Sequence, residues 1–199
     1  LDSEFEAAKS FKPNKADWLD GFWANMKSSR GSKRKILTSI SKENFIDIGD
    51  KISSYPENLN IHKTLARIIG NRKKMISSGE DIDWSTAEAL AFGSLLKDGF
   101  PVRLVGQDSI RGTFSQRHSA LVDQETEERY IPLNNISDNQ AIYEGIDSFL
   151  SEAAILGYEY GYSLDYPGSL VLWEAQFGDF ANGAQVQIDQ FIAPGEAKW

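Results

Sequence analysis

The sequence predicts an α/β fold in which a mainly parallel sheet is covered by helices. Two short, branched, apolar runs, at residues 101–106 and 170–173, have the length and composition of buried strands. Helical patterns precede, separate and follow these runs, which gives the order helix, strand, connection, helix, strand, helix. That alternation is typical of parallel strands joined by crossover helices. We place the boundary between a helical N-terminal segment, residues 1–80, and the α/β part, residues 81–199, near residue 80.

Residues 1–30 are predicted to be helical with breaks. Pro13 interrupts a polar start, and residues 28–40 have the composition of a flexible link. Between these features lie five bulky apolar residues, too many to leave in water, and they form one predicted face: Trp18, Leu19, Phe22, Trp23 and Met26.

Three further helices are indicated before the first strand. Ser41 is a predicted N-cap for a helix that ends before Pro56. An amphipathic pattern then covers residues 62–76 and stops at Gly79. Asp83 is predicted to cap the third helix, which ends at Asp98-Gly99 and whose expected inward face comprises Trp84, Ala87, Ala91 and Leu95.

A cluster of polar residues, 107–118, follows the strand at residues 101–106. In open α/β sheets the carboxyl ends of the strands are where ligands bind, so this cluster is a candidate site. Residues 130–135 are predicted to be a further extended piece.

The helix after Ser151 has a face of small residues. Its members, at helical spacing, are Leu150, Ala153, Ala154, Gly157 and Gly161. Each glycine costs such a helix about 1 kcal/mol relative to alanine, which suggests that a second helix, a second subunit or a ligand approaches the backbone. The run at 170–173 is expected to be buried on both faces. Gly178-Asp179 closes it, and the next helix has a predicted core stripe of Ala181, Ala184, Gln185, Ile188, Phe191 and Ile192.

Composition narrows the functional classes. The chain has 199 residues, 41% of them hydrophobic, with a net charge of −8 and no cysteine. The acidic balance argues against a nucleic-acid partner, and no apolar run approaches the length that spans a bilayer. Without cysteine there is no disulfide and no thiolate metal site. The one basic cluster is interpreted as a solvated connector rather than a phosphate site; it contains Lys27, Arg30, Lys33, Arg34 and Lys35.

Three stretches carry a resemblance to a known family: residues 150–154 (Leu-Ser-Glu-Ala-Ala), residues 173–185, which contain Glu-Ala-Gln-Phe-Gly-Asp-Phe-Ala-Asn-Gly-Ala-Gln, and residues 106–118. The chain resembles the decarboxylating first component of bacterial 2-oxoglutarate dehydrogenase, a thiamine diphosphate enzyme. More loosely it is similar to the pyrimidine-binding domain of 2-oxo acid dehydrogenases and transketolases. The resemblance implies that residues 81–199 are part of such a domain, truncated at the C-terminus.

The resemblance assigns a catalytic carboxylate. In that family a glutamate at the start of a helix binds the 1′ nitrogen of the coenzyme's aminopyrimidine, and Glu152 occupies the matching position. On pattern alone, Glu152 is equally a carboxylate placed at the positive end of a helix. The ring-stacking aromatic of the family corresponds to Phe177 or Phe180, either of which could instead belong to the core. Gln176 is a further cofactor-binding candidate.

By the same resemblance the loop at residues 106–118 lies at the active site. His118 would be catalytic and face the thiazolium and the 2-oxo acid, although by pattern alone it is a surface histidine. Gln107, Asp108 and Arg111 would support His118 or the cofactor.

The resemblance also implies partners and a missing part. The family holds magnesium and the diphosphate through a Gly-Asp-Gly motif that is absent here, so the metal ligands are expected outside this chain and the isolated fragment is expected to be inactive. The implied partners are 2-oxoglutarate, the dihydrolipoyl succinyltransferase and a second copy of the full-length chain, in the bacterial cytoplasm. The alternatives are a related 2-oxo acid dehydrogenase or decarboxylase, and a non-catalytic acidic α/β interaction module.

Overall fold

A parallel three-stranded sheet, in the order β4-β1-β5, forms the centre of the fold. The computed structural model describes residues 1–12, 21–24, 26 and 37–195. The strands are β1 (Val102–Gly106), β4 (Tyr143–Asp147) and β5 (Leu170–Glu174). Both edge strands pair with β1 in parallel register. The predicted α/β class with a parallel sheet is confirmed.

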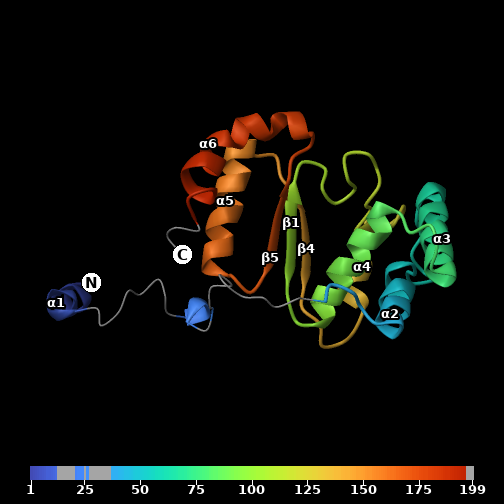
Figure 1. The fold of residues 1–199 in the computed structure, drawn as a ribbon, viewed down its shortest axis with the longest axis horizontal. Coiled ribbons are helices and arrows are strands. Elements are labelled where there is room, and N and C mark those ends of the chain that lie inside the picture. The colour runs from blue at the N-terminus through green and yellow to red at the C-terminus, as the bar shows by residue number, and fades with distance from the viewer. Residues whose placement is uncertain (13–20, 25, 27–36, 196–199) are drawn as a thin grey trace.

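Helices cover the two faces of this sheet (Figure 1). On one side lies α4 (Trp84–Lys97), against which α2 (Lys42–Ile52) packs, with α3 (Lys63–Ser78) beyond. On the other side lie α5 (Glu152–Asp165) and the helical C-terminal segment that contains α6 (Gln185–Gln187). The fold therefore has three layers, with the sheet in the middle.

The predicted helix ends are present in the structure. Ser41 Oγ accepts a hydrogen bond from Asn44 N at 3.1 Å, and Asp83 Oδ1 accepts one from Thr86 N at 2.7 Å. Gly79 ends α3 with a φ of 70°, a left-handed conformation that glycine adopts without a steric penalty. Ser151 caps α5 through Ala154 N at 3.4 Å. These termini are set by local chemistry, which is why the sequence predicts them.

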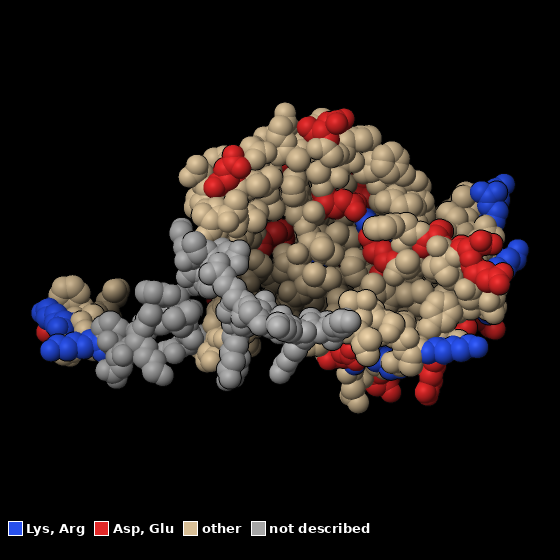
Figure 2. All heavy atoms as spheres, in the orientation of Figure 1, with Lys and Arg blue, Asp and Glu red and all other residues tan. Residues whose placement is uncertain are grey.

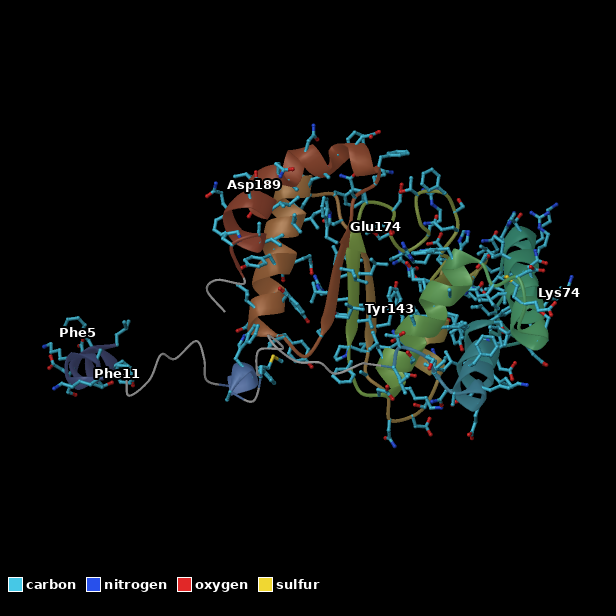
Figure 3. The ribbon with its side chains drawn as sticks, in the orientation of Figure 1. Phe5, Phe11, Lys74, Tyr143, Glu174 and Asp189 are labelled. Carbon is cyan, nitrogen blue, oxygen red and sulfur yellow. The ribbon has the colours of Figure 1, made fainter. Side chains whose placement is uncertain are left out.

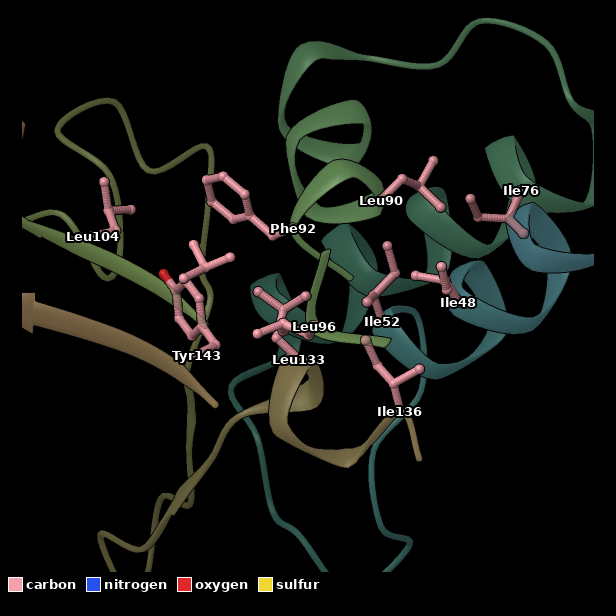
Figure 4. Close-up of a cluster of buried hydrophobic side chains, with 11 residues drawn as sticks. Ile48, Ile52, Ile76, Leu90, Phe92, Leu96, Leu104, Leu133, Ile136 and Tyr143 are labelled. Carbon is pink, nitrogen blue, oxygen red and sulfur yellow. The ribbon is translucent and has the colours of Figure 1, made fainter. Parts of the chain in front are cut away.

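The main core lies between α4 and the sheet and extends under α2 and α3 (Figure 4). Its aromatic pair, Phe92 of α4 and Tyr143 of β4, stacks with ring centroids 6.0 Å apart. The buried members of the core are Ile48, Ile52, Ile76, Leu90, Phe92, Leu96, Val102, Leu104, Leu133, Ile136 and Tyr143. Residues before position 80 thus share one core with the sheet.

The predicted inward face of α4 is wrong at three of its four residues; the fourth, Leu95, is partly buried and packs against the core. Trp84 is 85% exposed, and Ala87 and Ala91 are also exposed. The helix instead turns its opposite side to the core, burying Ser85, Thr86, Leu90, Phe92, Gly93 and Leu96. Both sides of this helix carry apolar residues, so periodicity alone does not tell which side meets the sheet.

Other strand predictions need correction. The sequence indicated no strand at β4, and residues 130–135 are not one extended piece: β3 (Arg129–Tyr130) pairs with β2 (Leu121–Val122), and Pro132–Asn135 form the 3-10 helix η3. Strand β5 is half-buried rather than buried on both faces, because it lies at an edge of the sheet.

The C-terminal helix is also less regular than predicted. It consists of the 3-10 segment η4 (Gly178–Ala184), α6 and the π-helical η5 (Ile188–Ile192). Ala184 is fully buried, and Ala181 and Ile188 are half-buried. Gln185 is exposed, and Phe191 and Ile192 are 45% and 37% exposed, so the predicted core stripe is wrong at these three positions. The changes of helical pitch move successive residues out of a single line along one face.

The small-residue face of α5 meets a helix at one point. A Cβ added to Gly157 would lie 3.1 Å from Gln187 Nε2 of α6, whereas one added to Gly161 would meet nothing within 4 Å. At Gly157, therefore, the neighbour that approaches the backbone is a side chain of α6. Gly161 borders an open groove formed with Tyr158, Tyr162 and Phe22.

Part of the N-terminal segment contacts α5. The helix α1 (Asp2–Ser10) buries no residue, but in η2 (Gly21–Trp23) the Trp23 ring nitrogen donates to Leu164 O at 2.5 Å. The predicted apolar face is described only at Phe22, Trp23 and Met26. Trp18, Leu19 and the predicted basic cluster lie outside the described residues.

Charges are unevenly distributed over the surface. On the face in Figure 2, acidic side chains are spread over the molecule, and most visible lysines and arginines lie toward α1 and α3. This pattern agrees with the net charge of −8. Among the described residues, no helix combines the length and apolar character that crossing a bilayer requires.

Close packing of α2 on α4 gives a stability prediction. A Cβ added at Gly93 would lie 2.5 Å from Ile48 Cγ2, and Ile48 is fully buried. We expect Gly93→Ala to lower the free energy of unfolding by about 1–3 kcal/mol through overpacking, measured by urea denaturation. The matched control is Gly70→Ala in α3, where an added Cβ meets nothing within 4 Å and alanine should be neutral or stabilising. Equal effects of the two changes would contradict the packing described here.

Candidate functional site

The carboxyl ends of the three strands meet at one edge of the sheet. Gly106 at the end of β1 is in register with Asp147 of β4 and with Glu174 of β5. The segments that follow each strand therefore start side by side. They carry every site residue that the sequence predicted, from Gln107 to Phe180.

The segment after β1 forms a tight loop. Asp108 O accepts from Gly112 N at 2.7 Å, and Arg111 O accepts from both Arg117 N and His118 N at 3.0 Å. Positive φ angles occur at Asp108, Gly112, Ser115 and His118, and for residues other than glycine this conformation is costly. Ile110 N also donates to Asp147 Oδ1 at 2.9 Å, which joins the loop to β4.

Arg117 is the principal anchor of this loop. Its guanidinium donates to the Glu88 carboxylate of α4, with Nε 2.6 Å from Oε1, and to the Glu174 carboxylate of β5, with Nη1 2.9 Å from Oε1. Nη1 also donates to Ser109 O at 2.7 Å. The Arg117 side chain is only 7% exposed. Burial alone would lower its pKa, but the hydrogen bonds from Glu174 and Glu88 outweigh that effect and raise the pKa, so Arg117 stays charged.

Three of the predicted cofactor-binding residues lie together at the start of the loop, where Asp108 contacts both Arg111 and Gln176. Asp108 forms an ion pair with Arg111 at 3.0 Å, and its Oδ2 accepts from Gln176 Nε2 at 2.8 Å. The arrangement joins the loop after β1 to the segment after β5. Gln107, the fourth polar candidate here, is half-buried directly after β1.

Aromatic side chains line the exposed side of the edge. Phe177 packs edge-to-face against Phe114, with centroids 5.8 Å apart, and against Phe180, at 5.9 Å. Their exposures are 44%, 75% and 46% for Phe177, Phe114 and Phe180. Phe114 and Phe177 border an open pocket of about 260 Å³ whose other lining residues are Thr113, Gln116, Glu174, Ala175, Gln176 and Gly178. Large rings that remain this exposed are available to a ligand or a partner surface.

Glu152 begins α5, beside η4. Its Oε2 would lie 3.4 Å from a Cβ added at Gly183, so the carboxylate packs against the backbone of η4. It is half-buried and makes no hydrogen bond or ion pair with any described residue. The sequence-based alternative, a carboxylate at a helix N-terminus, also fits its place as the first residue of α5.

His118 lies on the other side of the loop. It lines a small cavity together with Arg72 of α3, Glu88 of α4 and Tyr143 of β4. Burial lowers the pKa of its imidazole, and the nearby Arg72 and Arg111 guanidiniums lower it further, whereas the Ser115 backbone opposes the shift. The ring is therefore neutral at pH 7. No hydrogen bond or ion pair joins His118 to Glu152 among the described residues.

Several residues of the site were not indicated by the sequence. Arg117 and Glu88 were missed because these two residues, which contact each other, lie 29 positions apart in the sequence. Glu174, the second carboxylate that Arg117 contacts, lies 57 positions from Arg117. Phe114 was missed because a lone aromatic in a polar loop gives no periodic signal. Arg72, whose guanidinium donates to Arg117 O at 3.1 Å, lies in a predicted helix with no local mark of its role.

The fold and this edge together define an α/β domain with a candidate ligand site at the carboxyl ends of its parallel strands. Comparison with known proteins gives the family. The profile of the transketolase pyrimidine-binding domain matches residues 80–199. The chain belongs to this family.

Named relatives agree with the family. The chain is 59% identical, over its whole length, to the 2-oxoglutarate dehydrogenase E1 component of Brucella anthropi, and 58% identical to the proteins of that name from Brucella canis and Brucella suis. It covers 20% of each of these proteins, so it spans about a fifth of the length of the curated relatives it matches.

The Arg117 contacts give a second prediction. Arg117→Met would leave Glu88 and Glu174 close together with no cation between them, so the protein should lose roughly 3 kcal/mol of unfolding free energy. Urea denaturation measures this loss. Adding Glu88→Gln to Arg117→Met should restore part of it by removing one of the unpaired charges. A loss below about 0.5 kcal/mol would contradict the anchoring role.

Proposed function

We propose that this chain supplies the pyrimidine-binding part of a thiamine diphosphate-dependent enzyme that oxidatively decarboxylates 2-oxoglutarate and passes succinyl to a lipoyl group. The family match and the shared identity with proteins named 2-oxoglutarate dehydrogenase E1 component support the proposal. In it, residues 81–199 form part of the pyrimidine-binding domain and residues 1–80 a helical linker segment.

The observation that carries the proposal is the Glu152 carboxylate. It is half-buried, packs on the backbone of η4 and has no protein partner among the described residues. Phe177 and Phe180 flank the start of the same segment and are partly exposed. An aminopyrimidine has a flat aromatic ring and a basic ring nitrogen. It therefore requires a carboxylate that is free to bind the nitrogen and an aromatic side chain that stacks on the ring. The residues present fit that part of the cofactor.

Bound thiamine diphosphate would supply a carbon nucleophile that attacks the 2-oxo group and stabilises the charge left after carbon dioxide departs. Glu152 would hold a proton at the 1′ nitrogen of the aminopyrimidine, where a positioned carboxylate acts as a general acid and base. One of Phe177 and Phe180 would fix the plane of the ring. The neutral imidazole of His118 would accept or donate a proton near the substrate, and Gln107, Asp108, Arg111 and Gln176 would hold the loop or the cofactor.

The proposed function also requires a metal ion, a site for the diphosphate and partner proteins. No three acidic or histidine side chains of the described residues gather as metal ligands. We propose that magnesium and the diphosphate are held outside residues 1–199, that these residues alone are inactive, and that the full-length chain works as a homodimer with a dihydrolipoyl succinyltransferase in the bacterial cytoplasm. Carbon dioxide release from several 2-oxo acids by the full-length protein would identify the substrate. Release from another acid but not from 2-oxoglutarate would assign a related dehydrogenase or decarboxylase.

Glu152→Gln in the full-length protein tests the carboxylate. Glutamine keeps the size but cannot hold a proton at the ring nitrogen, so 2-oxoglutarate-dependent turnover should fall by about 100-fold or more with the fold intact by circular dichroism. Asp165→Asn, at the exposed end of the same helix, is the matched control and should change turnover little. Full activity of Glu152→Gln would favour a non-catalytic interaction module.

Phe177→Leu and Phe180→Leu, made separately, identify the stacking ring. Loss of an aromatic contact with the aminopyrimidine should weaken thiamine diphosphate binding by about tenfold in one variant, measured by isothermal titration of the full-length apoenzyme. The other variant should bind nearly as the parent does, because its ring contacts only neighbouring side chains. If both variants bind the cofactor normally, neither ring stacks on it.

A further inference from the structure

A small cavity lies behind the active-site loop, on the side away from the aromatic pocket. It is bounded by α3, α4, η3 and β4 as well as by the loop itself. Six polar side chains line it among apolar neighbours: Arg72, Glu88, Arg117, His118, Ser119 and Tyr143. The cavity offers about 10 Å³ to the centre of a water molecule. That volume is enough for one internal water and too small for an organic ligand.

The Tyr143 hydroxyl is the strongest sign that the cavity is used. Tyr143 is only 2% exposed. The Ser119 hydroxyl is close enough to its hydroxyl to affect the pKa of the phenol, but the Tyr143 hydroxyl makes no well-formed hydrogen bond to a described residue. Figure 3 places the side chain between the sheet and α4, and in Figure 4 its ring faces Phe92. Gly145, two residues later on the same face of β4, leaves room for the hydroxyl, since a Cβ there would lie 3.0 Å from it. An unpartnered buried hydroxyl is costly, and an ordered water is its usual partner.

The lining groups complement a single water. Burial raises the pKa of the Tyr143 phenol to about 12, so the phenol stays protonated and can donate. Arg72 is 4% exposed and can only donate. Glu88 and the unprotonated nitrogen of a neutral His118 can only accept. A water that accepts from Tyr143 and Arg72 would use its two hydrogens for Glu88 and His118.

We propose that this cavity is an internal water site and that its water, held by Tyr143 and Arg72, orients the His118 imidazole from the buried side of the loop. Tyr143 is then a positioning residue for His118. The role in the reaction rests on the proposed function, whereas the water site does not. The other ring nitrogen faces the backbone of Ser115, an exposed residue of the same loop.

The groups around His118 determine in which direction the pH profile of kcat/KM should move when the water is lost. The charged and titratable groups around it are Arg72 from α3, Glu88 from α4, Arg111 and Arg117 from the loop, and Tyr143 from β4. A water that donates to the ring nitrogen stabilises the neutral imidazole. Its loss should therefore raise the pKa of His118 and move the acid limb of the pH profile of kcat/KM to higher pH.

The direct test is a high-resolution crystal structure of the full-length protein. An ordered water within hydrogen-bonding distance of Tyr143 Oη, absent from Tyr143→Phe, would support the site. A dry cavity in the parent protein would overturn it. Neither result depends on thiamine diphosphate or on turnover, so this arm stands even if the proposed function fails.

The stability of Tyr143→Phe tests the water site independently, because a water-bonded hydroxyl and an unpartnered hydroxyl predict different changes. If the hydroxyl is bonded to water, Tyr143→Phe should lower the folding equilibrium constant by about fivefold. If the hydroxyl is unpartnered, phenylalanine should leave stability equal or raise it, which would overturn the water site. The matched control is Tyr158→Phe in α5, where the side chain is 61% exposed and loss of the hydroxyl should have no effect.

Activity tests the positioning role. In the full-length enzyme, Tyr143→Phe should lower kcat/KM several-fold and move its acid limb to higher pH, while Tyr158→Phe leaves the profile in place. An ordered water combined with an unmoved acid limb would overturn the positioning role. Should Glu152→Gln retain activity, the catalytic role proposed for this chain fails, and the structural and stability arms still decide the water site.

Discussion

The arrangement of this sheet edge depends on one buried cation. Arg117 joins three pieces of chain: Glu88 on α4, Ser109 in the loop and Glu174 at the end of β5. Two carboxylates this close, both largely shielded from water, would repel one another without it. The guanidinium neutralises that repulsion and donates directed hydrogen bonds to both carboxylates. These bonds fix the position at which the loop returns to the sheet.

This anchor divides the edge into two sides with different properties. On the inner side, Arg117, Arg72 and Tyr143 line a small cavity together with His118 and apolar neighbours. On the outer side, Phe114, Phe177 and Phe180 remain partly exposed, and Glu152 has no protein partner among the described residues. A packed inner side beside an outer side with partly exposed rings would suit the proposed binding of a planar cofactor.

Interactions between residues close in sequence made much of the fold predictable. The long-range contacts that support the site could not be predicted in this way. Ser41, Asp83 and Ser151 were identified because a cap acts within three residues. The face of α4 was misassigned because Trp84 and its exposed neighbours are as apolar as the buried side. β4 escaped notice because Glu144 and Gly145 interrupt its apolar pattern. Arg117 could not be found from sequence, because its partners become neighbours only after the strands align.

The most direct test of the account is a structure of the full-length protein with thiamine diphosphate bound. We expect the Glu152 carboxylate to lie within hydrogen-bonding distance of the 1′ nitrogen of the aminopyrimidine, with Phe177 or Phe180 against the ring. A cofactor bound elsewhere, with Glu152 directed into solvent, would contradict it.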